Sequence, residues 1–375
     1  MTQNARLCNN SPVIEPMRAL KVALVGCGAI SESFYGPAIS AIAPNDRLSV
    51  TCLVDPDPRR LSIVGATFPS ALQLLGLEGY NSEDIDLAVV ASPQRFHAEQ
   101  TIKLLTQGVH VLCEKPLASN LYEAEEMVKV ATQNKRLLAA GLFRRFFPIT
   151  QFIRDLISGE DLGKPIRFSW SEGGVFDWPA ATPSFFLKGS STGGVFADLG
   201  AHVLDLLLHW FGPVADFVYQ DDSMGGLEAN ASLHLRFEAG VTGQLRLSRD
   251  TPIPNSVWIE FERGFLWFQG GTAAEVTLHF KHSNLVAKSN LYSKSNQQIP
   301  FHLAPGEPAR TYAQSFMEQI RNLCRAIRGE DTLLVPASEA LASISLTEKC
   351  YASRKLMNMP WLSASEQVAA EAFVG

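Results

Sequence analysis

Two side chains able to move a proton stand four residues apart in one segment of this sequence. Asp198 and His202 lie within residues 193–205, where apolar residues recur at helical spacing. Residues four apart share one face of a helix, so the spacing predicts an orienting or proton-relay pair. Histidine titrates near neutral pH and can take the proton of a hydroxyl group that loses hydride. On its own, however, His202 is better explained as a hydrogen-bonded histidine of the core.

A lysine and a glutamate follow a predicted strand over residues 109–113, as Glu114 and Lys115 before Pro116. In a doubly wound parallel sheet, ligands bind outside the carboxyl ends of the strands. Lys115 is therefore placed to hydrogen-bond a reacting oxygen and to stabilise developing alkoxide charge. The turn from Ser92 and Pro93 to His97 leaves the preceding strand in the same way, and His97 is expected to fix this turn beside a cofactor. Cofactor binding is therefore predicted for these residues as well: Ser92, Pro93, His97, Glu114 and Lys115.

A glycine-rich turn follows the first predicted strand. Gly26, Gly28, Ala29 and Ile30 lead to Ser31, a G-x-G-x-x-G pattern with Ser in third place, ahead of a helix from about residue 32. The first glycine permits a tight turn, the second lets a pyrophosphate approach the backbone, and the helix N-terminus favours its charge. These residues are predicted to bind the cofactor.

An aspartate ends the second predicted strand and bears on the choice of cofactor. Asp55 lies where an adenosine ribose would be held, and a carboxylate there accepts ribose hydroxyl groups and repels a 2'-phosphate. The sequence therefore favours NAD(H). Arg59 and Arg60 keep NADP(H) open, although both are also typical of solvated residues in the first turn of a helix.

The elements that must position these residues fall into two groups. Apolar runs alternate with helical patterns over residues 19–147, which predicts a doubly wound parallel sheet, a Rossmann domain. After residue 147 strands follow one another with few helices between them, which predicts a second α/β domain over 148–375 built on a mostly antiparallel sheet, read as a meander. Residues 1–18 are expected to form a flexible tail. The predicted strands are 21–25, 48–54, 87–91, 109–113, 137–142, 166–171, 217–219, 232–237, 241–247, 257–261, 265–268 and 276–280, the predicted helices 96–107, 119–134, 151–157, 194–210, 312–328 and 338–355, and the linker-like stretch 288–308.

Composition excludes several classes of protein. The 375 residues are 46% hydrophobic and 19% charged with a net charge of -6, which is typical of a globular chain and argues against nucleic-acid binding. The six cysteines show no C-x-x-C spacing, so neither a zinc site nor a disulfide framework is expected, and the cytoplasm is the expected compartment. No apolar run reaches about 18 residues, so no membrane span is predicted.

Five motifs occur together and in order: the glycine turn, Ser-Pro-x-x-x-His at 92–97, Glu-Lys-Pro at 114–116, Arg-Phe at 145–146, and G-G-x-x-x-D-x-G-x-H-x-x-D at 193–205. Together they resemble the glucose-fructose oxidoreductase, inositol dehydrogenase and rhizopine-catabolism (Gfo/Idh/MocA) oxidoreductases from about residue 20 to 353. The resemblance implies a Rossmann domain with bound NAD or NADP, followed by a substrate-binding and oligomerisation domain with a large open sheet. It also implies a polyol or sugar substrate and a homo-oligomer formed through that sheet. Because nicotinamide itself carries the hydride, no metal is needed. The resemblance also implies that Lys115, Asp198 and His202 are the catalytic group.

Some features depart from the family or leave alternatives open. Gln94 stands where the family commonly has Asn, and Pro179 where an Arg is frequent. The contacts that the family's Asn and Arg make are therefore not expected at these two positions. Residues 178–191 are expected to border the substrate pocket. Arg144 and Arg145 suit either cofactor or substrate contacts or a salt bridge at the domain junction. A non-catalytic nucleotide-sensing regulator and a reductase or dehydrogenase of a dihydrodiol or bilin remain alternative functions.

Overall fold

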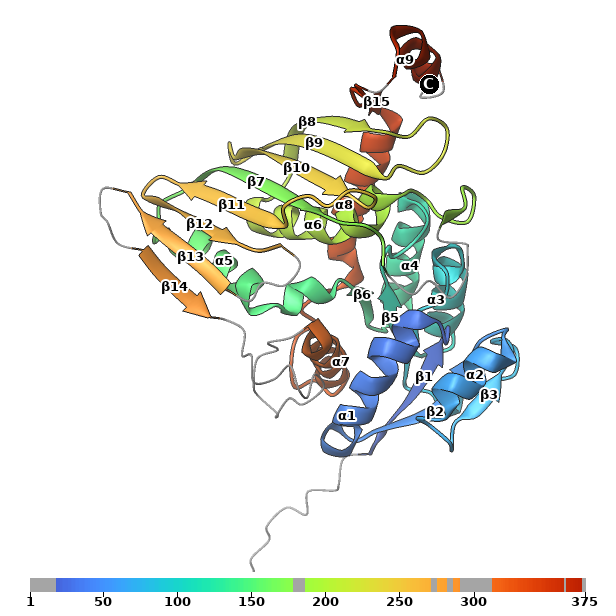
Figure 1. Cartoon of the computed structure of the whole chain (residues 1–375). Coiled ribbons are helices and arrows are strands. Elements are labelled where there is room, and N and C mark those ends of the chain that lie inside the picture. Colours follow the sequence, from blue (N-terminus) through green and yellow to red (C-terminus); the bar gives the residue numbers. More distant parts are fainter. Residues whose placement is uncertain are drawn as a thin grey trace, which may run out of the picture.

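A computed structural model describes residues 18–177, 186–270, 275–281, 286–290, 312–360 and 362–372. Its first sheet has six parallel strands in the order β3-β2-β1-β4-β5-β6, as predicted for a doubly wound domain (Figure 1). Parallel strands covered on both faces are apolar throughout, and all four residues of β4 are buried. The strands are β1 (Leu20–Val25), β2 (Leu48–Val54), β3 (Leu72–Leu74), β4 (Leu87–Val90), β5 (His110–Glu114) and β6 (Leu138–Gly141).

The helices of this first domain lie on both faces of its sheet. The helix expected from about residue 32 begins as a π-helical turn, η1 (Ser31–Tyr35), and continues as α1 (Gly36–Asp46). The short strand β3 was not predicted, because its residues are exposed or half-buried and form no apolar run. The other helices are α2 (Pro58–Gly65), η2 (Ser82–Asp84), η3 (Gln94–Phe96), α3 (His97–Thr106), α4 (Leu121–Gln133) and η4 (Phe143–Phe146).

The second sheet has nine strands in the order β14-β13-β12-β11-β7-β10-β9-β8-β15. It is mostly antiparallel, as predicted, but the simple meander is wrong. β7 (Pro165–Gly173) lies in the middle of the sheet, antiparallel to β11 and parallel to β10. Adjacency in sequence could not predict this insertion. The remaining strands are β8 (Val214–Asp221), β9 (Asn230–Phe237), β10 (Thr242–Ser248), β11 (Ser256–Phe261), β12 (Gly264–Phe268), β13 (Glu275–Phe280), β14 (Val286–Asn290) and β15 (Lys355–Leu356).

Helices α5 (Pro148–Gly159) and α6 (Val195–Phe211) accompany this second sheet, and α6 packs against β9 and β10. The last long helices return to the first domain. α7 (Tyr312–Ile327) packs on α1, and α8 (Ala337–Ala352) lies between α4 and α6 (Figure 1). The terminal helix is α9 (Ala364–Glu371). Most of the predicted linker, residues 288–308, lies outside the described residues.

One face of the nine-stranded sheet carries the core, and the other remains exposed. Burial alternates along β9 and β11, as it does in a sheet covered on one side. Phe237 and Phe261 point into the core with at most 1% exposure, whereas Val218 and Trp267 are 46% and 41% exposed. Within the described ranges, no helix combines the length and the apolar character that a membrane crossing requires.

Candidate active site

The glycine turn has the shape that a bound pyrophosphate requires. Gly26 has φ +94°, and a Cβ atom there would lie 2.5 Å from the backbone nitrogen of Ser92. Gly28 faces open space, with no neighbouring atom within 4 Å of the place of a Cβ. The Ser31 hydroxyl donates to the carbonyl of Gly26 at 2.6 Å and closes the turn. The first glycine is thus needed for packing, and the second leaves room for a ligand at the start of η1, so these residues fit a dinucleotide.

Asp55 organises this turn from the end of β2. Its carboxylate accepts the backbone N–H of Cys27 at 2.8 Å and that of Asp57 at 2.8 Å. Arg59 pairs with Asp57, and its side chain is 88% exposed, as expected for a solvated residue. Arg60 differs, because it donates to the carbonyl of Cys27 at 2.8 Å and also pairs with a glutamate of η1.

His97 joins the two loops that leave β4 and β5. Its ring nitrogens lie 2.8 Å from the carbonyl of Ser92 and 2.9 Å from the carbonyl of Pro116. Burial lowers the pKa of His97, although both carbonyl groups oppose this effect. The contacts agree with the expected role of fixing the turn, in which Ser92 also bonds Gln100 at 2.6 Å.

Gln94, in the same turn, reaches the second domain. Its side-chain amide donates to the carbonyl of Ala118 at 3.1 Å and to the hydroxyl of Thr192 at 2.8 Å. Trp178 and Pro179, the other departure from the family pattern, lie outside the described residues.

Glu114 holds the backbone of Lys115 in place. One carboxylate oxygen accepts the Lys115 N–H at 2.9 Å, and the other accepts the Tyr35 hydroxyl at 2.6 Å. Gln319 of α7 in turn donates to Tyr35 at 2.9 Å. Burial raises the pKa of Glu114 even though Tyr35 and Lys115 act in the opposite direction. The buried Glu114 thus fixes the backbone of Lys115, whose side chain reaches Asp198 of the second domain.

Asp198 lies between two cations from different elements. Its Oδ1 is 2.5 Å from Lys115 Nζ, and its Oδ2 is 2.7 Å from Arg249 Nη2. Burial alone would raise the pKa of Asp198, but Lys115 and Arg249 outweigh burial and hold it below its usual value. Arg249 follows β10 and stacks over Phe176, with 5.3 Å to the ring centroid. No motif of the sequence indicated Arg249.

His202 lies in an apolar part of the same site. It is 4% exposed and packs edge-to-face on Phe143, with 4.8 Å between the ring centroids. Its Nδ1 has no hydrogen-bond partner among the described residues. The predicted orienting pair with Asp198 is therefore not formed, because the carboxylate oxygens of Asp198 bond the two cations instead. Burial, reinforced by Lys115 and Arg144, lowers the pKa of His202 well below its usual value, so the ring is neutral at neutral pH.

Arg144 and Arg145 both form buried salt bridges from η4 into the second domain. Arg144 binds Glu172 of β7 through two contacts of 2.7 and 3.0 Å. Arg145 binds Asp205 of α6 at 2.6 and 2.7 Å, and its guanidinium also lies 2.5 Å from Nδ1 of His209. Of the two predicted roles, this geometry favours the salt bridge at the domain junction.

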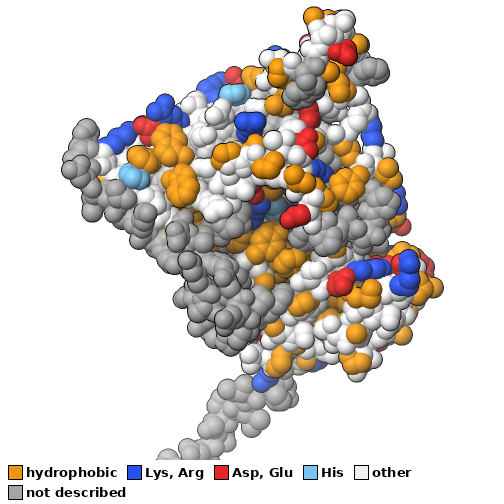
Figure 2. All heavy atoms as spheres, in the orientation of Figure 1, with side chains coloured by type: hydrophobic (Ala, Val, Ile, Leu, Met, Phe, Trp, Pro, Cys, Tyr) orange, Lys and Arg blue, Asp and Glu red, His pale blue; other side chains and the backbone are white. Residues whose placement is uncertain are grey.

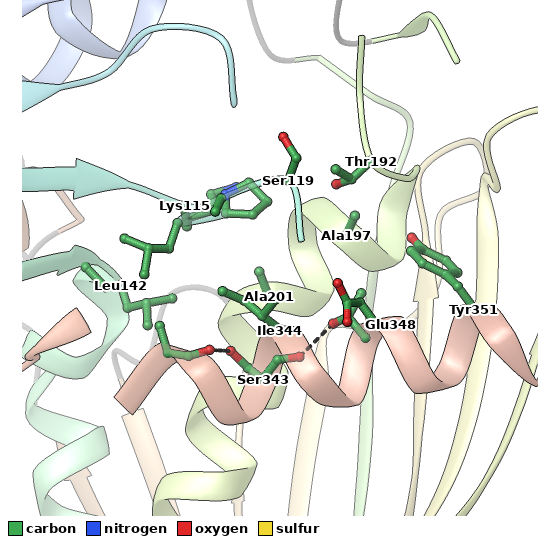
Figure 3. Close-up of a pocket in the computed structure, with 16 residues that line it drawn as sticks. Lys115, Ser119, Leu142, Thr192, Ala197, Ala201, Ser343, Ile344, Glu348 and Tyr351 are labelled. Carbon is green, nitrogen blue, oxygen red and sulfur yellow. Dashed lines mark hydrogen bonds between the residues drawn. The ribbon is translucent and has the colours of Figure 1, made fainter. Parts of the chain in front are cut away.

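One face of the molecule is hollowed (Figure 2), and a cavity lies next to Lys115. Figure 2 shows a hollow near the centre of one face, with apolar, acidic and basic side chains around it. A cavity of about 320 Å³ adjoins Lys115 on the side of α8, where Ala197 and Ala201 of α6 face Ile344 and Tyr351 (Figure 3). These alanines lie on a different side of α6 from Asp198 and His202. Ala197 and Ala201 of α6 therefore line this cavity, whereas Asp198 and His202 of the same helix do not.

Two family models match the chain and together cover more than half of it. Residues 20–142 match an oxidoreductase family with an NAD-binding Rossmann fold, and residues 150–267 match the GFO/IDH/MocA C-terminal domain. The class of protein is therefore a two-domain oxidoreductase whose first domain has an NAD-binding Rossmann fold. The chain belongs to the Gfo/Idh/MocA family.

Individual relatives are more distant. The chain is 27% identical over 193 residues to the rhizopine catabolism protein MocA of Rhizobium meliloti, which covers 50% of this chain and 56% of that protein. It is 27% identical over 247 residues to 1,5-anhydro-D-fructose reductase of Ensifer adhaerens, covering 65% and 68%. The first alignment thus spans about half the length of the relative.

Solved structures share the fold. Levoglucosan dehydrogenase in complex with NADH and levoglucosan superposes with a TM-score of 0.75 at 17% identity, over 90% of this chain and 97% of that one. An oxidoreductase from Agrobacterium radiobacter in complex with NAD+, L-tartaric acid and magnesium gives 0.74 at 20% identity, over 89% and 96%.

Proposed function

We propose that the protein is an NAD(P)-dependent dehydrogenase or reductase that moves hydride between nicotinamide and a secondary hydroxyl or ketone carbon of a sugar, cyclitol or sugar derivative. The supporting observation is the meeting of Lys115, Asp198 and Arg249 beside a neutral His202. This meeting lies at the carboxyl end of β5, in a sheet whose first strand leads into the glycine turn. The names of relatives agree, since they include a myo-inositol 2-dehydrogenase of Thermotoga maritima and a D-glucoside 3-dehydrogenase of Escherichia coli.

The cofactor supplies the hydride acceptor or donor, and the side chains handle the proton and the oxygen charge. A neutral imidazole can accept the hydroxyl proton when the alcohol is oxidised, so His202 is the proposed acid/base. Lys115 stabilises the alkoxide that forms, and Asp198 holds its ammonium group in place. Arg249 fixes Asp198 from the opposite side. For reduction of a ketone, His202 returns the proton.

The proposed cofactor site consists of the glycine turn, with Gly26, Gly28, Ala29 and Ile30, and of Asp55 below it. Ser92 and Pro93 after β4, His97 at the start of α3 and Glu114 at the end of β5 complete the site beside Lys115. Asp55 supports NAD(H) as the preferred cofactor, because a carboxylate repels a 2'-phosphate. Arg60 lies over the turn but is engaged with a backbone carbonyl and a glutamate, so NADP(H) is the second choice.

A non-sugar substrate is the second candidate. The chain is 25% identical over 260 residues to the trans-1,2-dihydrobenzene-1,2-diol dehydrogenase of mouse, covering 67% of this chain. The buried Phe143 ring separates His202 from Tyr312, which lies 4.5 Å from Phe143 between ring centroids and is 36% exposed, so Tyr312 offers aromatic surface one ring away from His202. Such surface suits an apolar ring as well as the carbon face of a sugar.

The test is a nicotinamide absorbance assay against polyols, aldoses, nucleotide sugars and a trans-dihydrodiol, each with NAD and with NADP. On the best substrate, His202→Ala is expected to lower kcat by about 10²- to 10⁴-fold, because it removes the acid/base. Lys115→Ala is expected to be at least comparably damaging, and His202→Ala should bind NADH nearly as the parent does. His234→Ala changes an exposed side chain of β9, far along the chain from both residues, and serves as the control. A His202→Ala enzyme with parental hydride transfer would move the base elsewhere, with Lys115 as the next candidate.

A further inference from the structure

Helix α6, which carries Asp198 and His202, has no capping side chain of its own. Its N-cap residue is Gly194, so the first backbone N–H groups need acceptors from outside the helix. Glu228, in the loop before β9, supplies them. Its Oε1 accepts the N–H of Gly194 at 2.8 Å and of Phe196 at 3.0 Å, and its backbone carbonyl accepts the N–H of Val195 at 3.0 Å.

The glycine pair before the helix permits this approach. A Cβ atom on Gly194 would lie 1.9 Å from the carbonyl oxygen of Glu228, and one on Gly193 would lie 1.9 Å from the hydroxyl oxygen of Tyr351. Neither position has room for a side chain. The two glycines of the 193–205 motif therefore allow the start of α6 to pack directly against Glu228 and Tyr351.

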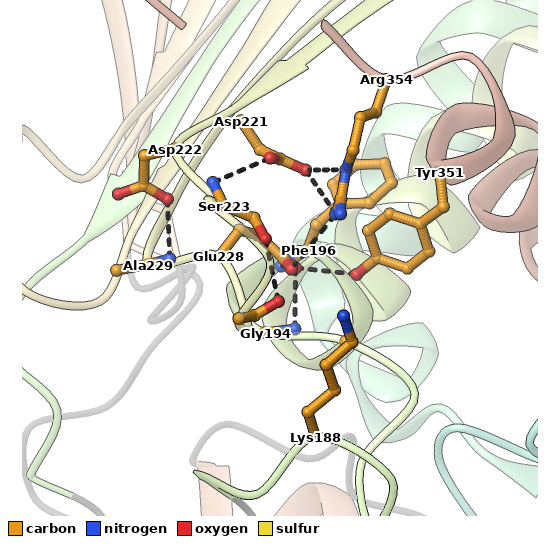
Figure 4. A network of polar contacts seen from close by, with 12 residues as sticks. Lys188, Gly194, Phe196, Asp221, Asp222, Ser223, Glu228, Ala229, Tyr351 and Arg354 are labelled. Carbon is orange, nitrogen blue, oxygen red and sulfur yellow. Dashed lines mark hydrogen bonds and ion pairs between the residues drawn. The ribbon is translucent and has the colours of Figure 1, made fainter. Parts of the chain in front are cut away.

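Glu228 is itself held rigidly (Figure 4). Its side chain is 1% exposed and accepts the Tyr351 hydroxyl at 2.7 Å, with Arg354 at 3.8 Å. Arg354 in turn donates to the fully buried Asp221 at 2.9 Å. The carboxylate lies at the positive end of the α6 dipole, where a negative charge is favourable. The start of α6 is thus fixed both to the β8–β9 side of the sheet and to the end of α8.

Asp198 lies one helical turn from this anchor and His202 two turns, whereas Lys115 comes from the other domain. A shift of the helix start would move both α6 side chains relative to Lys115, and a displacement of about 1 Å at a reacting group can cost about 10²-fold in rate. We propose that Glu228, together with Tyr351, is a positioning residue that sets where Asp198 and His202 stand relative to Lys115. This inference rests on the proposed function.

The first arm of the test measures chemistry on an identified substrate. Glu228→Ala is expected to slow single-turnover hydride transfer by about 10- to 10²-fold while the Kd of NADH changes little. Glu228→Gln keeps an oxygen acceptor for the helix N–H groups and should recover most of the rate. Asp46→Asn is the matched control, because it breaks a largely buried ion pair of 2.9 Å with Arg321, between α1 and α7. It should lower stability without slowing hydride transfer.

The second arm needs neither substrate nor cofactor, so it stands even if the protein is not a dehydrogenase. The pKa of His202 is followed by NMR in the full-length chain, with its signal assigned by a His202→Gln variant. In the parent, burial with Lys115 and Arg144 nearby keeps this pKa well below its usual value. In Glu228→Ala a loosened helix start admits water, and the pKa rises toward about 6.5.

Tyr351→Phe removes one hydrogen bond to Glu228 and should raise the His202 pKa less, in the same direction. It carries the test if Glu228→Ala does not fold. If His202 titrates as in the parent in every folded variant, and the variants lose only stability as Asp46→Asn does, Glu228 is a structural cap and the proposal is overturned.

Discussion

Lys115 meets Asp198 from the opposite domain, and this contact determines what the Asp198 carboxylate binds. With both carboxylate oxygens engaged by cations, Asp198 acts on Lys115 and Arg249 rather than on His202. The imidazole of His202 is neutral, and its Nδ1 finds no hydrogen-bond partner among the described residues. At the scale of residues, the site is thus a row of paired charges next to a neutral imidazole.

Replacing Arg249 tests this row of charges. Arg249 helps to hold the pKa of Asp198 below its usual value, so Arg249→Gln should raise that pKa. We expect the acid limb of the kcat/KM profile to move up by about 1 pH unit, because protonation of Asp198 releases Lys115. The measurement is a pH profile on the best substrate. Arg246→Gln, on the exposed side of β10, is the control and should leave the profile in place; coinciding profiles for all three proteins would contradict the role of Arg249.

At the scale of elements, the two glycines of the turn have different functions, one in packing and one in leaving room for a ligand. Gly26 is surrounded by backbone atoms and has a positive φ, whereas Gly28 faces empty space. The first position therefore serves the packing of β1 against the β4 loop. The second position is free for a ligand at the helix start.

Matched substitutions distinguish the two glycines. Gly26→Ala should lower the melting temperature strongly, because the left-handed backbone alone costs about 1–2 kcal/mol and the new Cβ meets Ser92. Gly28→Val should melt near the parent but lose NADH binding in a fluorescence titration. A Gly28→Val protein that binds NADH as tightly as the parent would show that the pyrophosphate lies elsewhere.

The sequence predicted the elements more reliably than their partners. Periodicity indicated the parallel sheet and the helix bearing Asp198 and His202, because each pattern is local. The place of β7 between β10 and β11, the reach of Arg249 and the cap supplied by Glu228 join residues from separate parts of the chain. No spacing along the sequence encodes such contacts, so only the structure brings them together.

At the scale of the whole molecule, the nine-stranded sheet leaves one of its faces exposed. Trp267 and Val218 lie on it with 41% and 46% exposure. Exposed aromatic and branched side chains on a broad sheet are typical of a protein interface. We propose, as the family resemblance implies, that copies of the chain associate through this face.

Light scattering of the purified protein tests this association. The parent is expected to have the mass of a dimer or larger assembly, and Trp267→Glu should shift the mass toward that of a monomer, because it places a charge in an apolar contact. Tyr122→Glu changes a side chain that is 72% exposed on α4 and should leave the mass unchanged. A monomeric parent at micromolar concentration would rule the interface out.

The return of α7 and α8 to the first domain has a consequence for how the chain is made. The backbone N–H of Ala140 donates to the carbonyl of Val335 at 3.1 Å, so the edge strand β6 is closed by a segment about 200 residues later. Likewise, Ile39 of α1 is fully buried in a core shared with Phe316. During synthesis, the Rossmann domain leaves the ribosome before these later residues do. Its β6 edge and the core side of α1 stay uncovered until the C-terminal segments have been made. The Rossmann domain is therefore completed only after α7 and the segment before α8 have been synthesised.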